Sequence, residues 1–280
     1  MIVKYFFIFF CCISSLLFSK EYKYDLAVCT IFQNDAKYLP EWIEFHQQQG
    51  VEHFYLYNNL SQDNWKEILT SCIKKRLVEI IDWPPNEDIS QNWNQIQCSA
   101  YMDCIKKIKK ICKWCAFIDT DEFLFSPGCK SLPKILKEYT QYGGVGANWI
   151  FYGTSWIEKI LPGEKMLEKL TMRPKNYIYH TTIKSIVQPE FVIDCVNPHW
   201  FIFTPGKFHV SENKEIIATY FTEYPSVENL RINHYWTRDR NFFYGEKLKR
   251  YQKWGYSGKD FEDLEKKFNE IHDPIILDNL

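Results

Sequence analysis

Apolar runs alternate with amphipathic segments along the first half of the chain. Four runs have the pattern of strands: residues 24–32, 51–59, 76–83 and 114–119. The first of them is apolar enough to be buried on both faces of a sheet. Three segments between them have apolar side chains at helical spacing: residues 39–50, 64–75 and 91–110. This alternation, with a period of roughly 25–30 residues, predicts an α/β fold with a mostly parallel central sheet and helices on both faces.

The second half of the chain has a different pattern. A short helix is expected at residues 131–139 and a strand at 144–153, and short β-like runs broken by Pro and Gly extend to residue 236. Helical patterns follow at residues 239–253 and 260–271. We therefore expect one domain over residues 24–253 with a β-rich second half, and a helical tail at 254–280.

The first 20 residues stand apart from this pattern. Lys4 precedes an apolar stretch from Tyr5 to Phe18, and Ser19 follows it. A basic start, a short apolar run and a small residue near its end resemble a secretory signal. The run is shorter than the ~20 residues that span a bilayer, which leaves an uncleaved anchor or a buried helix as alternatives. We expect residues 1–20 to be a signal peptide or membrane anchor of an exported or membrane-associated protein.

Composition and charge narrow the function classes. The chain has 280 residues, of which 46% are hydrophobic and 25% charged, and a formal net charge of −1. This balance argues against a nucleic-acid partner, whose recognition requires clustered Lys and Arg. Cys112 and Cys115 have the spacing of a zinc or redox pair, but no second pair follows, which favours cysteines in the core. In an exported protein some cysteines could pair, with a connectivity that the sequence does not give.

The stretch "WCAFIDTDEFLF" at residues 114–125 places carboxylates directly after an apolar strand. Ligands of open parallel sheets bind at the carboxyl ends of the strands, which is where Asp119 and Asp121 fall. Two carboxylates at i and i+2 can bind Mg²⁺ or Mn²⁺ that is shared with substrate phosphates. A solvated turn in which Asp121 caps a helix is the alternative, because an Asp-x-Asp pair alone is a weak signal.

The loops after the first two strands reach the same edge of the predicted sheet. Their polar side chains suit contacts to a base or a ribose: Thr30, Asn34, Asn58, Asn59, Ser61 and Asp63. Local turn hydrogen bonds would explain each of these residues equally well when it is taken alone. Their convergence on one edge favours a ligand.

Four segments, in this order, resemble glycosyltransferase family 92 and its bacterial family-2-like relatives. They are "CTIFQNDAKYLPEWIEFHQQQGVEHFYLYNNLSQDN", "WCAFIDTDEFLF", "KSIVQPE" and "INHYWTRDRNFFYGEK", and together they cover roughly residues 25–250. The resemblance implies a GT-A-like, Rossmann-like fold, a nucleotide-sugar donor and a divalent metal. It implies that Asn34–Asp35 and Asn58–Asn59 bind the nucleotide and that Asp119-Thr120-Asp121 is the DXD metal motif.

The sequence departs from the family pattern at two positions. Asn58 stands where relatives often have Asp, which leaves one charge fewer beside the nucleotide. Asp239 follows Arg238 where a Lys-Ser pair is commoner, which places a carboxylate near an expected phosphate contact. Both departures fall on predicted donor contacts.

The last of these segments carries a histidine and an arginine suited to a metal–diphosphate site. A neutral imidazole is a good Mn²⁺ ligand, and the family comparison implies that His234 completes the metal shell. Arg238 could neutralise a diphosphate. A hydrogen-bonded core histidine is the alternative for His234, and His199 and His209 are weaker candidates.

The acceptor site and the general base are less well defined. Three aromatic side chains near residues 148–156 could stack on sugar rings, or could be core residues: Trp149, Tyr152 and Trp156. A carboxylate would deprotonate the acceptor hydroxyl, and Glu158 and Asp239 lie in suitable regions. Glu122 adjoins the metal motif as a supporting or capping residue. The basic side chains Lys247, Lys249, Arg250 and Lys253 are expected on a solvated helix face.

These observations favour a hexosyltransferase that moves a sugar, with galactose as the leading candidate, from a nucleotide-diphosphate sugar to a glycan acceptor. The resemblance implies an inverting reaction that depends on Mn²⁺ or Mg²⁺. One alternative is a metal-dependent nucleotidyl or phosphoryl transferase, which would use the same carboxylates. Another is a surface carbohydrate-binding protein without catalytic activity.

Overall fold

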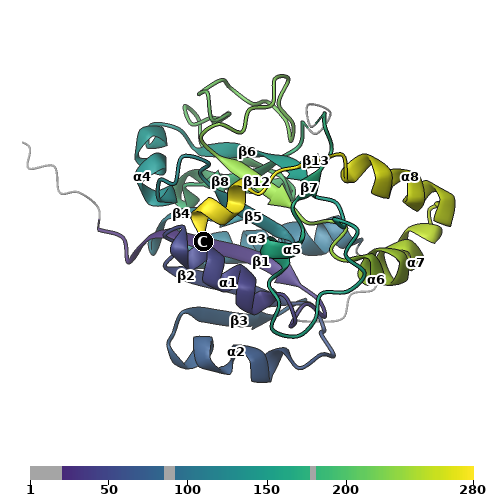
Figure 1. Ribbon diagram of the computed structural model, residues 1–280. Coiled ribbons are helices and arrows are strands. Elements are labelled where there is room, and N and C mark those ends of the chain that lie inside the picture. Colours follow the sequence, from purple (N-terminus) through teal and green to yellow (C-terminus); the bar gives the residue numbers. More distant parts are fainter. Residues whose placement is uncertain (1–20, 85–91, 177–180) are drawn as a thin grey trace, which may run out of the picture.

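The computed structural model describes residues 21–84, 92–176 and 181–280, so the predicted leader lies outside the described residues. The core of the described part is a mixed sheet with the order β3-β2-β1-β4-β8-β6-β12-β5, and β11 pairs with β6 (Figure 1). The α/β fold predicted from the sequence is confirmed. No helix in the described ranges is long and apolar enough to cross a membrane.

The first half of the chain forms the parallel part of the sheet. Its strands are β1 (Tyr24–Phe32), β2 (His53–Asn58), β3 (Val78–Asp82) and β4 (Cys112–Phe117). The helices between them are α1 (Leu39–Gln48), α2 (Trp65–Lys74) and α3 (Trp93–Ile108). Side chains of α1 and α2 pack on one face of the sheet and those of α3 on the other. The predicted placement of helices on both faces is therefore confirmed.

The second half adds strands in both directions. These are β5 (Glu122–Phe125), β6 (Gly144–Phe151), β8 (Ile183–Val187), β11 (His209–Val210) and β12 (Arg231–His234). β8 runs antiparallel between β4 and β6, and β12 lies between β6 and β5. The hairpin of β9 (Val192–Asn197) and β10 (Trp200–Phe203) packs with α3. The second half is thus β-rich, as expected, but it mixes parallel and antiparallel strand pairs.

Short helical elements complete this half. They are α4 (Leu132–Leu136), η1 (Lys137–Tyr139), α5 (Met166–Lys169), η2 (Pro189–Phe191), α6 (Arg240–Phe242), η3 (Phe243–Lys247), α7 (Leu248–Gln252), α8 (Gly258–Phe268) and η4 (Ile275–Asn279). β7 (Met172–Arg173) pairs with β13 (Ile271–His272). The C-terminal residues are packed on the domain, because Asp273 pairs with Arg231 and Ile276 is fully buried.

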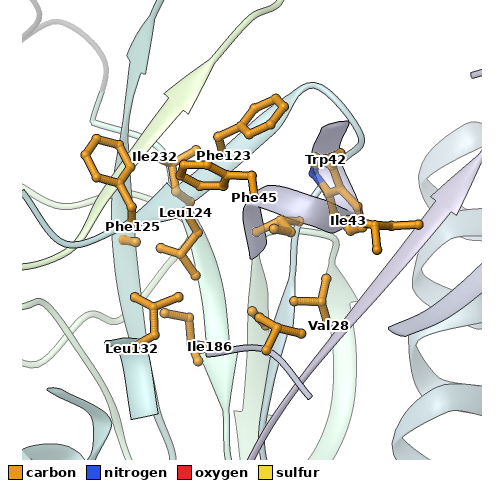
Figure 2. Packing of buried hydrophobic residues seen from close by; sticks show 14 of the residues in the cluster. Val28, Trp42, Ile43, Phe45, Phe123, Leu124, Phe125, Leu132, Ile186 and Ile232 are labelled. Carbon is orange, nitrogen blue, oxygen red and sulfur yellow. The ribbon is translucent and has the colours of Figure 1, made fainter. Parts of the chain in front are cut away.

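Helix α1 covers the free edge of β5. Figure 2 shows Trp42 and Phe45 of this helix among the buried side chains around β5. The indole N–H of Trp42 donates to the carbonyl of Glu122 at 2.8 Å, and the backbone N–H of Leu124 donates to Nε2 of His46 at 3.1 Å. Both contacts satisfy backbone groups that an edge strand would leave unpaired. They also fix the position of the β4–β5 turn.

Cysteine contributes to the core as predicted. Cys112 and Cys115 are fully buried, on the face of the sheet that α3 covers. The cysteines of the described residues carry free thiols. Cys112 and Cys115 therefore act as small apolar side chains, in agreement with the interpretation as core residues.

Candidate functional site

The turn between β4 and β5 carries Asp119, Thr120 and Asp121 at the carboxyl edge of the parallel strands. The backbone N–H of Glu122 donates to the carbonyl of Asp119 at 3.1 Å, which closes the turn. The backbone N–H of Tyr235 donates to the carbonyl of Asp121 at 2.7 Å and ties the turn to the residue after β12. Asp119 and Asp121 therefore lie outside the strands, where a ligand can approach them.

Both carboxylate oxygens of Asp119 are engaged by neighbouring side chains. Oδ1 accepts from Nε2 of Gln97 at 2.7 Å, and Oδ2 accepts from Nζ of Lys184 at 2.8 Å. Lys184 lies on β8, is 1% exposed, and also approaches Oε2 of Glu122 at 3.5 Å. Burial by itself would lower the pKa of Lys184, but Asp119 and Glu122 raise it above its ordinary value. The lysine therefore stays charged and neutralises the Asp119 side of the turn.

Sequence reasoning did not select Lys184. The residue belongs to the segment "TIKSIVQ", where a lysine interrupts an apolar strand pattern. A charged side chain in a strand of a central sheet needs a partner, because Lys is almost never fully buried unpaired. That interruption was the available signal.

Asp121 lies with His234 and Glu122 on the other side of the turn. Nε2 of His234 is 3.5 Å from Oδ1 of Asp121, and Nδ1 is 4.0 Å from Oε1 of Glu122. The register of β12 against β5 places His234 directly opposite Glu122. Nδ1 of His234 and Oε1 of Glu122 are buried and have no hydrogen-bond partner among the described residues.

The two acidic side chains of this group titrate in opposite directions. Burial would raise the pKa of Asp121, but the adjacent His234, together with Lys247 and Arg238, holds it well below its ordinary value. Burial raises the pKa of Glu122 well above its ordinary value, and Lys184 opposes that shift only in part. Asp121 therefore favours the ionised form, whereas burial makes ionisation of Glu122 less favourable.

Asp35 links the first loop to the C-terminal segment. Its carboxylate accepts from the hydroxyl of Thr120 at 2.8 Å and from Nη2 of Arg238 at 2.8 Å. The Arg238 guanidinium is 3.8 Å from the ring centroid of Tyr38 and 4.6 Å from that of Phe242. Arg238 is thus paired and stacked, and its exposed fraction is 5%.

The other predicted nucleotide contacts mainly organise loops. The amide of Asn58 donates to Asp82 at 2.8 Å, and that of Asn59 donates to the carbonyl of Trp83 at 3.1 Å. Oδ1 of Asn34 accepts from the backbone N–H of Gln62 at 2.7 Å, although the residue is exposed. Thr30 is fully buried within β1. The structure therefore does not support a donor contact through the side chain of Thr30.

The three aromatic residues predicted for the acceptor lie in different surroundings. Trp149 lies with its ring centroid 4.7 Å from that of His234, and its indole N–H has no partner among the described residues. Tyr152 is fully buried and donates to the carbonyl of Asp273 at 2.9 Å, so its ring is not available to an acceptor. Trp156 is 51% exposed. It lines a cavity of about 420 Å³ together with Arg240 and Tyr244.

The two carboxylates predicted as the base also differ. Asp239 is 2% exposed and caps α6 by accepting from the backbone N–H of Phe242, while its other oxygen accepts from that of Ile160, each at 2.9 Å. Both oxygens are therefore committed to backbone groups, which argues against Asp239 as the base. The side chain of Glu158 is 78% exposed and lies 3.2 Å from Arg240.

The expectation that the basic side chains of the C-terminal helix all face solvent is wrong for Lys247. The structure leaves Lys249, Arg250 and Lys253 exposed but buries Lys247 to 6% exposure. Lys247 ends the π-helical turn η3, and its ammonium lies 4.6 Å from the ring centroid of Trp236. The charge pattern alone did not distinguish this lysine from its neighbours.

A metal ion at this edge would need ligands beyond the protein. Within the described part of the chain, no three or more His, Cys, Asp or Glu side chains are grouped so as to hold a metal ion. Asp121 and His234 lie together, whereas Asp119 is engaged by Gln97 and Lys184. The arrangement suits a cation that is shared with substrate oxygens.

Comparison with known sequences identifies the family. The family model of Glycosyltransferase family 92 matches residues 24–272, which is most of the chain. The chain belongs to glycosyltransferase family 92. The match extends past residue 253 and includes α8 and β13.

Two relatives of this family 92 chain illustrate the similarity. A glycosyltransferase family 92 protein of Oryza sativa subsp. japonica is 30% identical over 216 residues, which cover 76% of this chain and 33% of the relative. A beta-1,4-galactosyltransferase of Caenorhabditis elegans is 34% identical over 119 residues, which cover 40% of this chain and 27% of the relative. The chain thus spans about a third of the length of the curated relatives it matches.

Among solved structures, S. aureus TarS 1–349 matches with a TM-score of 0.38 and 15% identity, over 59% of this chain and 47% of that chain. A likeness at this level supports no conclusion about the site. The family model and the mixed sheet together describe a family 92 domain with an α/β fold.

Proposed function

We propose that this family 92 protein transfers a hexose, with galactose as the leading candidate, from a nucleotide-diphosphate sugar to a glycan acceptor. The group formed by Asp121, His234 and Glu122 carries the proposal, because its polar atoms converge at the carboxyl edge of the sheet and are not saturated by the protein. The similarity to a beta-1,4-galactosyltransferase supports galactose.

A divalent cation, Mn²⁺ or Mg²⁺, fits this group. Asp121 and His234 would hold it, through an ionised carboxylate and the Nε2 atom of the imidazole. Glu122 faces the opposite ring nitrogen of His234 and would fix the orientation of the imidazole, as carboxylates do beside many metal-ligating histidines. When bound, the cation would neutralise charge on the donor diphosphate.

The remaining residues prepare the site in distinct ways. Lys184 and Gln97 hold Asp119 in place, so that the turn presents Asp121 in one orientation. The Asp35–Arg238 pair joins the loop after β1 to the C-terminal segment beside the turn. Trp149 packs edge-on against His234, and its buried indole N–H has no partner among the described residues. These side chains orient a substrate and limit the access of water.

The transfer itself is proposed as a single displacement with inversion. The acceptor hydroxyl loses its proton to a carboxylate as its oxygen attacks the anomeric carbon, and the nucleoside diphosphate leaves. Glu158 is the proposed base because its side chain faces solvent, whereas Asp239 is committed to backbone N–H groups. Exposed Trp156 lies nearby in the sequence as an acceptor platform.

A donor screen tests this function. Purified protein with Mn²⁺ would be incubated with UDP-galactose, other nucleotide sugars and nucleoside triphosphates, and the released product identified. Nucleoside diphosphate released from a nucleotide sugar supports the proposal, and galactose transfer to a glycan defines the sugar. Release of pyrophosphate or phosphate from a triphosphate would instead favour a nucleotidyl or phosphoryl transferase. Glycan binding without turnover of any donor would favour the carbohydrate-binding alternative.

A further inference from the structure

The C-terminal segment carries four basic side chains between residues 231 and 247, all within the described residues. Three of them have acidic partners: Arg231 with Asp273, Arg238 with Asp35, and Arg240 with Glu265. The fourth, Lys247, makes no hydrogen bond and no ion pair with any described residue. It is therefore the basic side chain of this segment that is left to meet an external anion.

Burial makes the unpaired state of Lys247 unusual. Its exposed fraction is 6%, and its ammonium lies 4.6 Å from the ring centroid of Trp236 and 5.8 Å from that of Phe242. Lysine is almost never buried without a partner, because removing its charge from water is unfavourable. The aromatic faces offset this loss only in part.

Local structure directs this side chain inward. Phe243 and Lys247 are the buried residues of η3, and they begin and end this π-helical turn. Single π-helical turns within α-helices are rare and occur often at functional sites. The flanking helices α6 and α7 have no buried residue. The turn thus places one ammonium group among otherwise apolar contacts.

The ring of Phe242 connects Lys247 to the candidate site. The Lys247 ammonium lies 5.8 Å and the Arg238 guanidinium 4.6 Å from its centroid, and Arg238 pairs with Asp35. Burial lowers the pKa of Lys247 to about 8, and Asp121 is the largest opposing influence, since its charge favours the ammonium form. Asp35 acts in the same direction. Lys247 and Arg238 therefore lie against the same ring, beside the Asp35–Arg238 pair that borders the proposed donor site.

We infer that Lys247 binds the diphosphate of the donor and stabilises it as the leaving group. This role deepens the proposed function and rests on it. Arg238, which the sequence suggested for the diphosphate, is already paired with Asp35 and stacked between two rings. Lys247 supplies the uncommitted charge that the developing diphosphate requires.

Calorimetric titration of the full chain with UDP in the presence of Mn²⁺ tests this inference. The variants are Lys247→Met, which keeps the length of the side chain without its charge, Lys247→Arg, and the matched control Lys249→Gln on the exposed face. Loss of one charge-assisted contact predicts a rise in Kd of about tenfold to a hundredfold for Lys247→Met. Lys247→Arg is expected to retain more of the affinity than Lys247→Met, and Lys249→Gln to match the wild-type protein.

The same titration with uridine separates this role from a structural one. A structural role predicts that Lys247→Met weakens uridine and UDP alike, whereas a diphosphate contact weakens UDP alone. Equal affinity of Lys247→Met and wild-type protein for UDP would overturn the inference and leave the proposed function intact. If wild-type protein binds neither UDP nor GDP with Mn²⁺, the proposed function and this inference fail together.

A second measurement uses the wild-type protein and does not depend on a variant that folds. Brief acetylation followed by peptide mass spectrometry reports the accessibility of each lysine. UDP with Mn²⁺ is expected to reduce modification of Lys247 severalfold and to leave Lys249 unchanged. Protection of neither lysine, under conditions where UDP is bound, contradicts the inference.

Discussion

Two buried acidic regions of the molecule differ in how completely their hydrogen bonds are satisfied. Glu212, in the loop after β11, accepts from the backbone N–H groups of Glu228, Asn229 and Leu230 at 2.8, 2.9 and 2.6 Å, and from the hydroxyl of Ser226. At the β4–β5 turn, Oε1 of Glu122 and the facing Nδ1 of His234 have no partner among the described residues.

The difference separates a carboxylate that the protein saturates from one that keeps an oxygen without a partner among the described residues. The protein alone saturates Glu212, so this residue fixes the path of residues 226–230 and has nothing left to offer a ligand. At the β4–β5 turn, Oε1 of Glu122 and Nδ1 of His234 keep hydrogen-bonding capacity that no described residue fills. Both carboxylates are buried, but of the two only Glu122 has an oxygen without a partner in the described part of the chain.

The largest expected effect comes from Asp121→Asn. The substitution keeps the shape of the side chain but removes the charge beside His234, and we expect kcat/KM to fall by at least about a hundredfold. The thermal unfolding midpoint should fall as well, because His234, Lys247 and Arg238 stabilise the ionised carboxylate in the folded chain, so turnover is expressed per folded molecule. Donor turnover and calorimetry measure the two effects. Wild-type turnover in this variant would remove Asp121 from the mechanism.

Glu212→Gln is the reciprocal test of the comparison. An amide in place of the carboxylate turns one acceptor into a donor that faces backbone N–H groups, and we expect the free energy of unfolding to fall by about 2–4 kcal/mol. Turnover per folded molecule should be unchanged. Chemical denaturation and an activity assay below the unfolding transition report both quantities. Loss of turnover without loss of stability would show that the two regions do not differ in the way proposed.

The contribution of buried His46 to the free energy of unfolding should depend on pH. The histidine is fully buried between the carbonyl of Trp42 and the N–H of Leu124, and burial lowers its pKa to about 3 from an ordinary value near 6.5. Between these values the unfolded chain binds more protons, so this contribution to stability falls as the pH falls from 6.5 toward 3, by about 1 kcal/mol per pH unit. Denaturation at several pH values, with His46→Gln as the reference, measures it. Parallel pH profiles for the two proteins would exclude this contribution.

Lys247 should show a smaller pH effect at the alkaline end. Its pKa in the folded protein is about 8, below the ordinary value of 10.5, so the unfolded chain again binds more protons between these values. The free energy of unfolding should therefore rise relative to Lys247→Met from pH 8 to pH 10.5, by about 1 kcal/mol per unit over this narrower window. Denaturation curves across that range measure the difference. A constant difference would mean that the lysine is charged equally in both states.

Much of the first half of the fold could be predicted because local patterns determine it. The apolar run that ends before Asp119 is β4, and the stripe with Trp42 and His46 is α1. The same periodicity correctly placed Asp119 and Asp121 outside the strands. These features depend on neighbouring residues in the sequence, which a pattern of apolar and polar positions records.

The second half and part of the site depend on distant contacts. Lys184 meets Asp119 because β8 runs antiparallel beside β4, and nothing near residue 184 specifies that pairing. Lys247 differs from Lys249 only through the π-helical turn that directs it inward. Asp239 resembled a free carboxylate in the sequence, but it caps α6. The sequence patterns therefore did not predict contacts that depend on which strands pair, or on which side of a helix a residue lies.

The position of β12 in the sheet has a consequence for how the chain folds while the ribosome synthesises it. β12 fills the place between β6 and β5, two strands that leave the ribosome well before it. Until residues 231–234 emerge, β5 and β6 each keep a row of unpaired backbone groups, and the edges can pair with other chains. A chain that stops before residue 231 would lack both His234 and the strand that closes the sheet. Completion of the candidate site and pairing of the inner edges of β5 and β6 therefore both depend on β12.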